Sequence, residues 1–204
     1  MNPLVVGITG GSASGKSTFA EALGRSLDDL SPVIVNQDRY FRNWMDYPEE
    51  VRESVRTANH PRAILWDALR DQIARLKAGK PISEPAKGTR ASDRGGEEKS
   101  FGPSSLVIVE GHLIFWHKPL RDLLSLRIYI DADPHERVLR RMLRDTNRRG
   151  NLEQAVSWYR RDVLPNFPIY TAPTRRFADV VVPFDQHNQA ALEVIASGLR
   201  KMLE

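Results

Sequence analysis

Short apolar runs alternate with longer amphipathic segments along this chain. Five of the runs are short and mostly apolar, which is typical of strands buried on both faces of a parallel sheet. They occupy residues 4–9, 33–36, 106–110, 126–130 and 180–182. The segments between them carry apolar residues at helical spacing, and several begin with Pro or Asn, which are common at helix starts. They predict helices at residues 17–27, 61–78, 134–148, 152–163 and 188–203.

The regular alternation of strands and helices predicts an α/β fold with a doubly wound parallel sheet of about five strands, joined by right-handed crossovers. Residues 79–105 interrupt this alternation, because they contain few apolar side chains and many Gly, Pro, Ser and charged ones. We expect them to form a polar excursion from the sheet. Residues 1–204 as a whole are predicted to be one domain.

The composition narrows the class of protein. A chain of 204 residues with 41% hydrophobic content can bury the core of such a domain. The apolar stretch at residues 4–8 is too short for a signal peptide or a membrane span, so we expect a soluble protein without a membrane partner. The absence of cysteine excludes disulfides, thiol nucleophiles and cysteine-ligated metals. The net charge of +4 is modest, which directs attention to local clusters of arginine.

A glycine-rich loop follows the first predicted strand. Residues 10–18 read GGSASGKST and match G-x-x-x-x-G-K-[ST], a P-loop in which backbone N–H groups and the next helix start surround a phosphate. A chance glycine-rich turn is disfavoured by the position between strand and helix, and the dinucleotide fingerprint does not match. ATP or GTP is therefore expected, with Lys16 reaching the β and γ phosphates and the hydroxyl of Ser17 on Mg²⁺. The predicted nucleotide-binding residues of the loop are Gly10, Gly11, Ser12, Ala13, Ser14, Gly15, Lys16, Ser17 and Thr18.

Two carboxylates stand at the carboxyl ends of predicted strands, where ligands bind in open α/β sheets. Asp38 follows the second strand and is a candidate base that accepts the proton of an attacking hydroxyl. Its alternative role is that of an ordinary turn or helix-capping residue. Glu110 ends the strand LVIVE and is a candidate for holding Mg²⁺ directly or through water, the alternative being an ion pair with an arginine.

A stripe of arginines is predicted on one face of the helix at residues 134–148. Arg137, Arg141, Arg144 and Arg148 recur at intervals of four, three and four, while apolar residues at 138–139 and 142–143 cover the other face. Closing the stripe over ATP would bring cations to the transferring phosphoryl group and exclude water, so residues 134–150 are a candidate lid. The alternative is an exposed basic face or a nucleic-acid patch, but no aromatic residues interleave for stacking.

These motifs together resemble the uridine kinase family, within the phosphoribulokinase and uridine kinase group of P-loop kinases. The similarity covers nearly the whole chain and is carried by GGSASGKST, NQDRYF, NHPRAILWDAL, IVEGHLIF, DADPHERVLRRMLRDTNRRG and PTRRFADVVVP. It implies transfer of the γ phosphate of ATP to the 5′-hydroxyl of a pyrimidine nucleoside. By this resemblance Asp38 corresponds to the catalytic base and Glu110 to the acidic residue that serves magnesium. Arg141, Arg144 and Arg149 correspond to lid positions.

The acceptor is expected to bind near the second strand end and the lid. The candidate acceptor contacts are Asp38, Tyr40, Asn59, His60, Arg94 and Arg137. His60 has the alternative of capping the helix that follows it. Three departures from the family leave the acceptor open between a nucleoside and another sugar- or alcohol-containing metabolite. Asn59 replaces an Asp that grips the ribose, residues 87–89 replace a Tyr-Asp-Phe stretch that stacks on the base, and Asn151 replaces an Arg after the lid glycine.

Two classes of function therefore remain. The first is an ATP-dependent small-molecule kinase with Mg²⁺, in which Asp38, Lys16, Arg141 and Arg144 act in catalysis. The second is a regulatory or mechanical NTPase, which is weakened by the lack of a recognisable partner-binding segment. We expect a cytoplasmic enzyme with a small-molecule substrate and no nucleic-acid partner, and the resemblance is compatible with a homo-oligomer.

Overall fold

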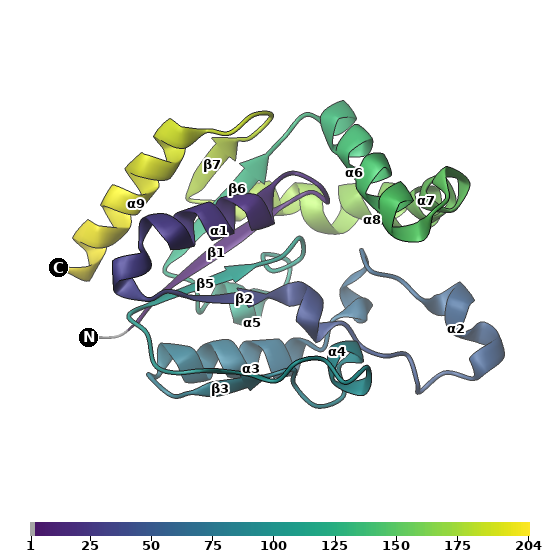
Figure 1. The fold of residues 1–204 in the computed structure, drawn as a ribbon, viewed down its shortest axis with the longest axis horizontal. Coiled ribbons are helices and arrows are strands. Elements are labelled where there is room, and N and C mark those ends of the chain that lie inside the picture. The colour runs from purple at the N-terminus through teal and green to yellow at the C-terminus, as the bar shows by residue number, and fades with distance from the viewer. Residues whose placement is uncertain (1–2) are drawn as a thin grey trace.

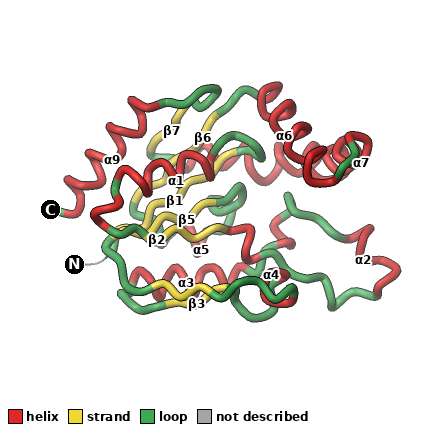
Figure 2. Tube along the Cα trace, in the orientation of Figure 1, coloured by secondary structure: helices red, strands yellow, loops and turns green. Residues whose placement is uncertain are grey.

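Five parallel strands form a sheet that is covered by helices on both faces (Figure 1; Figure 2). The computed structural model describes residues 3–204, without the side chains of residues 148 and 149. The strand order is β2-β5-β1-β6-β7, which confirms the predicted sheet. Their bounds are β1 Leu4–Gly10, β2 Val33–Asn36, β5 Leu106–Glu110, β6 Leu126–Asp131 and β7 Val180–Pro183.

The central strand β1 pairs on one side with β5, in the register Leu4↔Leu106, and on the other with β6, in the register Val6↔Leu126. All residues of β5 are buried, as is expected of an apolar strand between two layers of helices. Because all five strands are parallel, their carboxyl ends meet at one edge of the sheet. The loop residues that follow these ends are therefore brought close together.

Two hydrophobic cores lie on the two faces of the sheet. One face is covered by α1 (Lys16–Ser26) and α9 (Gln189–Leu203), and the other by α3 (Trp66–Lys77) and α5 (Lys118–Arg121). Neighbouring residues of β1 alternate between the two cores, since Val5 belongs to the core under α3 and Val6 to the core under α1. The predicted helix at 61–78 starts later than expected, because a 3₁₀ turn occupies Pro61–Ala63 before α3 begins.

The remaining helices gather beyond the carboxyl edge of the sheet. In Figure 1, α6 and α7 lie above this edge, and α2 and α4 lie below it. After α7 the chain stays helical, with π and 3₁₀ turns, as far as residue 177. The bounds of the α-helices are α2 Glu49–Val55, α4 Arg90–Asp93, α6 Pro134–Arg149, α7 Leu152–Trp158 and α8 Leu164–Asn166. The π turns are Tyr159–Val163 and Phe167–Thr171, and the 3₁₀ turn is Ala172–Phe177.

The polar excursion at residues 79–105 contains regular structure. Two short strands, β3 (Ile82–Glu84) and β4 (Lys99–Phe101), form an antiparallel hairpin, and α4 lies between them. The backbone N–H of Arg90 donates to the carbonyl of Phe41 at 2.7 Å, which ties the excursion to the segment after β2. Strands of three residues are too short for a periodic pattern to reveal them.

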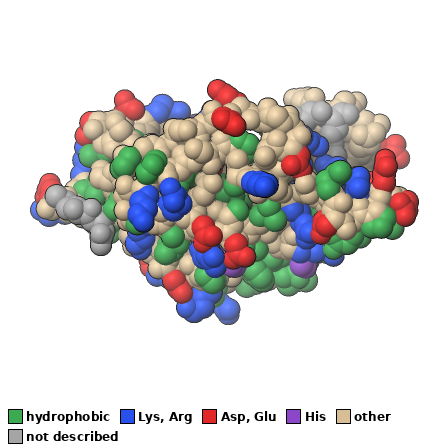
Figure 3. Space-filling model, turned by 90° about the horizontal axis from the view of Figure 1, so that it is seen from below, with side chains coloured by type: hydrophobic (Ala, Val, Ile, Leu, Met, Phe, Trp, Pro, Cys, Tyr) green, Lys and Arg blue, Asp and Glu red, His purple; other side chains and the backbone are tan. Residues whose placement is uncertain are grey.

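The outer surface carries charges of both signs. Acidic and basic side chains are interspersed on the face shown in Figure 3.

On α6 the leucines face outward, with exposed fractions of 59% for Leu139 and 70% for Leu143. Within residues 3–204, no helix combines the length and the apolar character needed to cross a membrane.

Candidate functional site

The loop between β1 and α1 is a cradle that a larger residue would fill. Its backbone turns through left-handed conformations, with φ of +154° at Gly10, +62° at Ala13 and +92° at Gly15. A Cβ added to Gly10 would lie 2.5 Å from the carbonyl oxygen of Ile130, and one added to Gly15 would collide with the ring of Phe184. The hydroxyl of Ser14 is buried without a hydrogen-bond partner among the described residues. These features fit a loop that wraps a phosphate.

A cavity of about 570 Å³ opens over this loop. Its volume lies within the roughly 300–1,000 Å³ that is usual for small-molecule sites. It is lined by Ala13, Gly15, Lys16, Ser17, Thr18, Arg140, Arg144, Phe184, Asp185, Gln186 and His187. The segment at 184–187 was missed in the sequence analysis, although it follows the carboxyl end of β7 and the same criterion that selected Asp38 would have found it.

The arginines of α6 rest on the phosphate-binding loop. Arg141 is 7% exposed and donates to the hydroxyl of Ser12. A Cβ on Gly11 would collide with the guanidinium of Arg137, whose carbon also lies 4.1 Å from the ring centroid of Phe167. Arg137, which the sequence analysis placed on the acceptor, therefore lies against the nucleotide loop in this structure. Arg149 falls outside the residues whose side chains are described.

Asp145 holds two of these arginines and was missed in the sequence analysis. Its carboxylate accepts from Nε of Arg141 at 2.7 Å and from Nε of Arg144 at 3.0 Å. Burial raises the pKa of Asp145. The two arginines together lower this pKa by more than burial raises it, so the pKa lies below its usual value. The Asp145 contribution to stability is therefore present at neutral pH and is lost only as the pH falls through the lowered value. The Arg-x-x-x-Asp spacing on one helix was the available signal.

Glu110 lies at the centre of the carboxyl edge and is 3% exposed. The hydroxyl of Ser17 donates to its Oε1 at 3.0 Å, and the amide of Asn36 donates to the same oxygen. Burial raises the pKa of the Glu110 carboxyl, Lys16 lowers it and Asp38 raises it. The charges of Lys16 and Asp38 thus act on one carboxylate.

The donor set at this edge suits magnesium bound together with a nucleotide. Among the described residues, no group of three or more His, Asp or Glu side chains forms a metal cage of protein ligands alone. Mg²⁺ usually takes one or two protein oxygens and completes its shell with phosphates and water. Ser17 and Glu110 provide such oxygens beside the loop, so these residues fit the ion.

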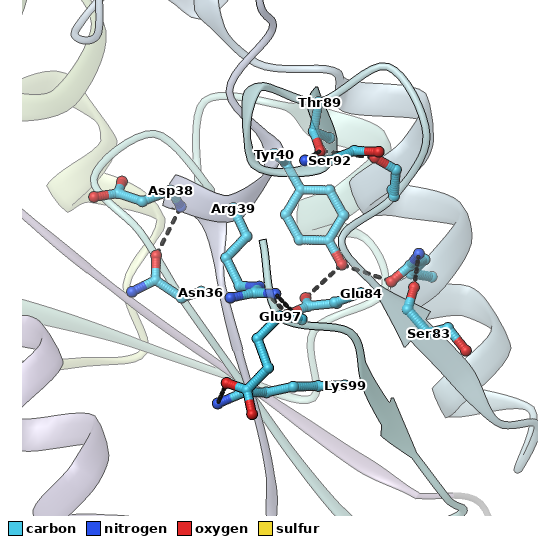
Figure 4. A network of polar contacts seen from close by, with 12 residues as sticks. Asn36, Asp38, Arg39, Tyr40, Ser83, Glu84, Thr89, Ser92, Glu97 and Lys99 are labelled. Atoms are coloured by element: carbon cyan, nitrogen blue, oxygen red, sulfur yellow. Dashed lines mark hydrogen bonds and ion pairs between the residues drawn. The ribbon is translucent and has the colours of Figure 1, made fainter. Parts of the chain in front are cut away.

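Asp38 is exposed at the carboxyl end of β2, in the 3₁₀ turn Gln37–Tyr40. Its backbone N–H donates to Oδ1 of Asn36 at 2.7 Å, so Asn36 and not Asp38 supplies the cap of this turn. No hydrogen bond or ion pair of the Asp38 side chain joins it to another described residue. Figure 4 shows the carboxylate pointing away from the polar network around Glu84. It is therefore free to meet a ligand.

The two residues after Asp38 anchor this turn to the excursion (Figure 4). Tyr40 is fully buried, and its hydroxyl lies 2.7 Å from Oε1 of both Gln72 and Glu84. Nε of Arg39 lies 2.7 Å from Oε2 of Glu84, whose pKa is raised by burial. Tyr40, which the sequence analysis placed on the acceptor, instead lies in the core and supports the turn that carries Asp38.

Tyr40→Phe is expected to lower the free energy of unfolding by about 1–3 kcal/mol, because the buried Glu84 carboxyl loses a hydrogen-bond partner. Urea denaturation followed by circular dichroism measures this loss. Tyr47→Phe is the matched control, since no hydrogen bond of the Tyr47 hydroxyl to a described residue is found. Equal stability of the two variants would contradict the role assigned to Tyr40.

Asn59 and His60 are engaged with the helical segment that follows α7. Nδ2 of Asn59 donates to Oδ2 of Asp162 at 2.7 Å, and Asp162 is 3% exposed. Nδ1 of His60 accepts from the N–H of Arg62 at 3.1 Å, and its Nε2 lies 2.8 Å from the hydroxyl of Tyr170. His60 thus caps the turn that follows it, which was the alternative considered above. Contacts of Asn59 and His60 with an acceptor stay predictions.

His112 lies near the charged groups of the carboxyl edge. It is buried, and its Nε2 lies 2.9 Å from the carbonyl of Ala58, so Nε2 carries the proton and donates. Burial is the largest cause that lowers the pKa of His112, and Lys16 and Arg141 also lower it. Against the opposing effects of Asp38 and the Ala58 carbonyl, the pKa falls to about 4. The ring is therefore neutral at neutral pH.

Comparisons with known proteins bear on the family and the fold. Residues 5–191 match the model of the Phosphoribulokinase / Uridine kinase family. A uridine kinase of Geobacillus sp. (strain WCH70) is 34% identical over 204 residues, which cover 99% of this chain and 96% of that protein. A putative fructose transport system kinase from Silicibacter sp. TM1040 has a TM-score of 0.66 at 20% identity, covering 89% of this chain and 90% of that one. Phosphoribulokinase from Rhodobacter spheroides has a TM-score of 0.66 at 14% identity, covering 89% of this chain and 70% of that one. The two solved structures thus share the fold of this chain.

Proposed function

The chain belongs to the phosphoribulokinase and uridine kinase family, and we propose that it is an ATP-dependent kinase that transfers the γ phosphate to a hydroxyl of a small metabolite. One observation carries the proposal. The side chain of Ser17, next to Lys16, and the side chain of Asn36, which also accepts from the backbone N–H of Asp38, both donate to the buried carboxylate of Glu110 at the carboxyl edge of the sheet. A base and a phosphate-binding cation are thereby held at one place, as transfer to an alcohol requires.

The residues divide the work of such a transfer. The loop amides and Lys16 hold the phosphates, and Asp38 accepts the proton of the acceptor hydroxyl or orients that hydroxyl toward the γ phosphate. Arg141 and Arg144, oriented by Asp145, stabilise the negative charge of the transferring group. Magnesium, which Ser17 and Glu110 would hold, neutralises charge on the phosphates when it is bound.

The name of the uridine kinase relative makes uridine the first acceptor to consider, and the family resemblance adds cytidine and the 5′-hydroxyl. A specific observation favours a second candidate, another sugar- or alcohol-containing metabolite. Residues 87–89 are Lys, Gly and Thr, and Gly88 has a φ of +80°, so no aromatic ring is available there to stack on a base. Loss of such a stacking partner costs roughly 1–3 kcal/mol per base.

A screen of acceptors with Mg-ATP tests the proposal. We expect a phosphorylated product, detected by mass spectrometry, from uridine, cytidine, another nucleoside or a sugar alcohol. ADP formation that depends on the acceptor confirms transfer and separates it from hydrolysis. Hydrolysis of ATP at the same rate with every acceptor, stimulated by a protein or nucleic acid, would contradict the kinase and favour a regulatory NTPase.

A further inference from the structure

A further cavity, of about 290 Å³, lies beside the turn that carries Asp38. Its walls come from the segment after that turn, from α2 and the residue that follows it, and from α4 in the polar excursion. Four arginines and two carboxylates line it, together with Asn43, Trp44 and Met45. The charged residues are Arg52, Glu53, Arg56, Arg90, Asp93 and Arg94.

The carboxylates of this cavity already have partners. Glu53 pairs with Arg56 at 3.3 Å and with Arg161, outside the cavity, at 3.1 Å. Asp93 accepts a hydrogen bond from the amide of Asn43. The guanidinium groups of Arg90 and Arg94 have no ion pair with any side chain that the structure describes. The cavity therefore keeps a positive charge that the protein does not neutralise.

Arg90 is held in place by the segment that carries Asp38. Its backbone N–H donates to the carbonyl of Phe41, and its guanidinium carbon lies 5.0 Å from the ring centroid of Phe41. Burial lowers the pKa of the Arg90 guanidinium. The positive charges of Arg94 and Arg56 lower this pKa further, and the negative charge of Asp38 raises it. Three guanidinium groups and the candidate base thus lie within one electrostatic field.

We propose that Arg90, Arg94 and Arg56 bind an anionic group of the acceptor, so that the substrate is a hydroxyl compound carrying a phosphate or a carboxylate. The proposal rests on the kinase function proposed above and names its substrate class. A guanidinium presents paired N–H donors that match the oxygens of both anions. The anion would occupy the cavity, while a hydroxyl of the same molecule lies at Asp38. This arrangement also accounts for arginines in an excursion that lacks an aromatic platform.

Matched acceptors with and without the anion test the proposal. The pairs are D-ribose with D-ribose 5-phosphate, D-ribulose with D-ribulose 5-phosphate, and glycerol with D-glycerate, and uridine is assayed beside them. We expect the charged member of at least one pair to have a kcat/KM at least about tenfold higher than the neutral member, as one hydrogen bond between charged groups provides. The pair that responds distinguishes a phosphate from a carboxylate. Turnover of uridine or of neutral sugars with no gain from the anion would overturn the proposal.

The variant Arg90→Gln should raise the KM of the charged acceptor about tenfold or more and leave the KM of ATP unchanged. Arg70→Gln is the control, because Arg70 lies on the exposed face of α3 and pairs with Asp67 and Asp71. An unchanged acceptor KM in Arg90→Gln would count against the proposal.

Direct binding separates this proposal from the kinase function itself. Calorimetry measures binding of D-ribose 5-phosphate and D-glycerate to protein saturated with Mg-ADP, so that the phosphate loop is filled. Binding that Arg90→Gln weakens supports the anion site even if no acceptor turns over, in which case only the kinase function fails. Binding of neither anion, or equal binding by both proteins, would overturn the anion site.

Discussion

Asp38→Asn is expected to lower kcat by about 10²–10⁴-fold while the dissociation constant for ATP changes little. The amide keeps the size of the side chain and its hydrogen-bonding ability but cannot take up the proton of the acceptor hydroxyl. Nucleotide affinity should persist, because in the proposed function the phosphates would be held by the loop, Lys16 and the arginines of α6, and no hydrogen bond or ion pair joins the Asp38 side chain to these described groups. Turnover is measured with the acceptor that the screen identifies, and ATP affinity by calorimetry.

Asp71→Asn is the control for this variant. Asp71 lies on α3, is exposed and pairs with Arg70, so the same chemical change there should leave turnover and ATP affinity as they are. Full turnover in Asp38→Asn would refute the role of the carboxylate. Parallel losses of turnover and ATP affinity would show that Asp38 acts through the nucleotide site and not on the acceptor.

Gly10→Ala is expected to disrupt nucleotide binding and the sheet edge together. The backbone of Gly10 has a φ of +154°, and a Cβ there would lie 2.5 Å from the carbonyl oxygen of Ile130, which belongs to the paired strand β6 and cannot rotate away. The left-handed conformation alone costs about 1–3 kcal/mol in a residue other than glycine. We expect a melting temperature lower by about 2–4 °C for each kcal/mol lost, and ATP affinity reduced more than tenfold.

Gly102→Ala provides the matched glycine control. Nothing lies within 4 Å of a Cβ at Gly102, and its φ is outside the left-handed region. The free energy of unfolding of this variant should differ from that of the unaltered protein by less than about 0.5 kcal/mol, so its melting temperature should change little. A Gly10→Ala protein with the ATP affinity and melting temperature of this control would show that the loop does not need its present shape.

The sequence was sufficient to predict the sheet because its inner strands β1 and β5 are buried on both faces. A strand such as β5 shows this burial as an uninterrupted apolar run, and the phosphate loop has a pattern that fixes its place between β1 and α1. The hairpin of β3 and β4 and the short helix α4 escaped prediction, since a few residues carry no measurable period. Their position depends on contacts with Phe41 and Tyr40, which are distant in the sequence.

Roles that depend on distant partners were also not readable from the sequence. Tyr40 looks like any loop aromatic until Glu84 is found at its hydroxyl, and Asn59 looks free until Asp162 is found at its amide. The sequence predicted that the arginines of α6 share one face of the helix. The apolar residues on the opposite face, however, do not pack against a core. Arg141 faces inward, where the carboxylate of Asp145 pairs with its charge and the hydroxyl of Ser12 accepts a hydrogen bond from it, and Leu139 and Leu143 are left exposed.

The central position of β1 has a consequence for how the chain is made. Its neighbours on the two sides begin at Leu106 and Leu126, so the first strand leaves the ribosome long before either partner exists. Contacts between residues so far apart form slowly, and an unpaired apolar strand is prone to wrong associations. Until β5 has been synthesised, as far as residue 110, the first strand of the nascent chain therefore has neither of its neighbouring strands to pair with.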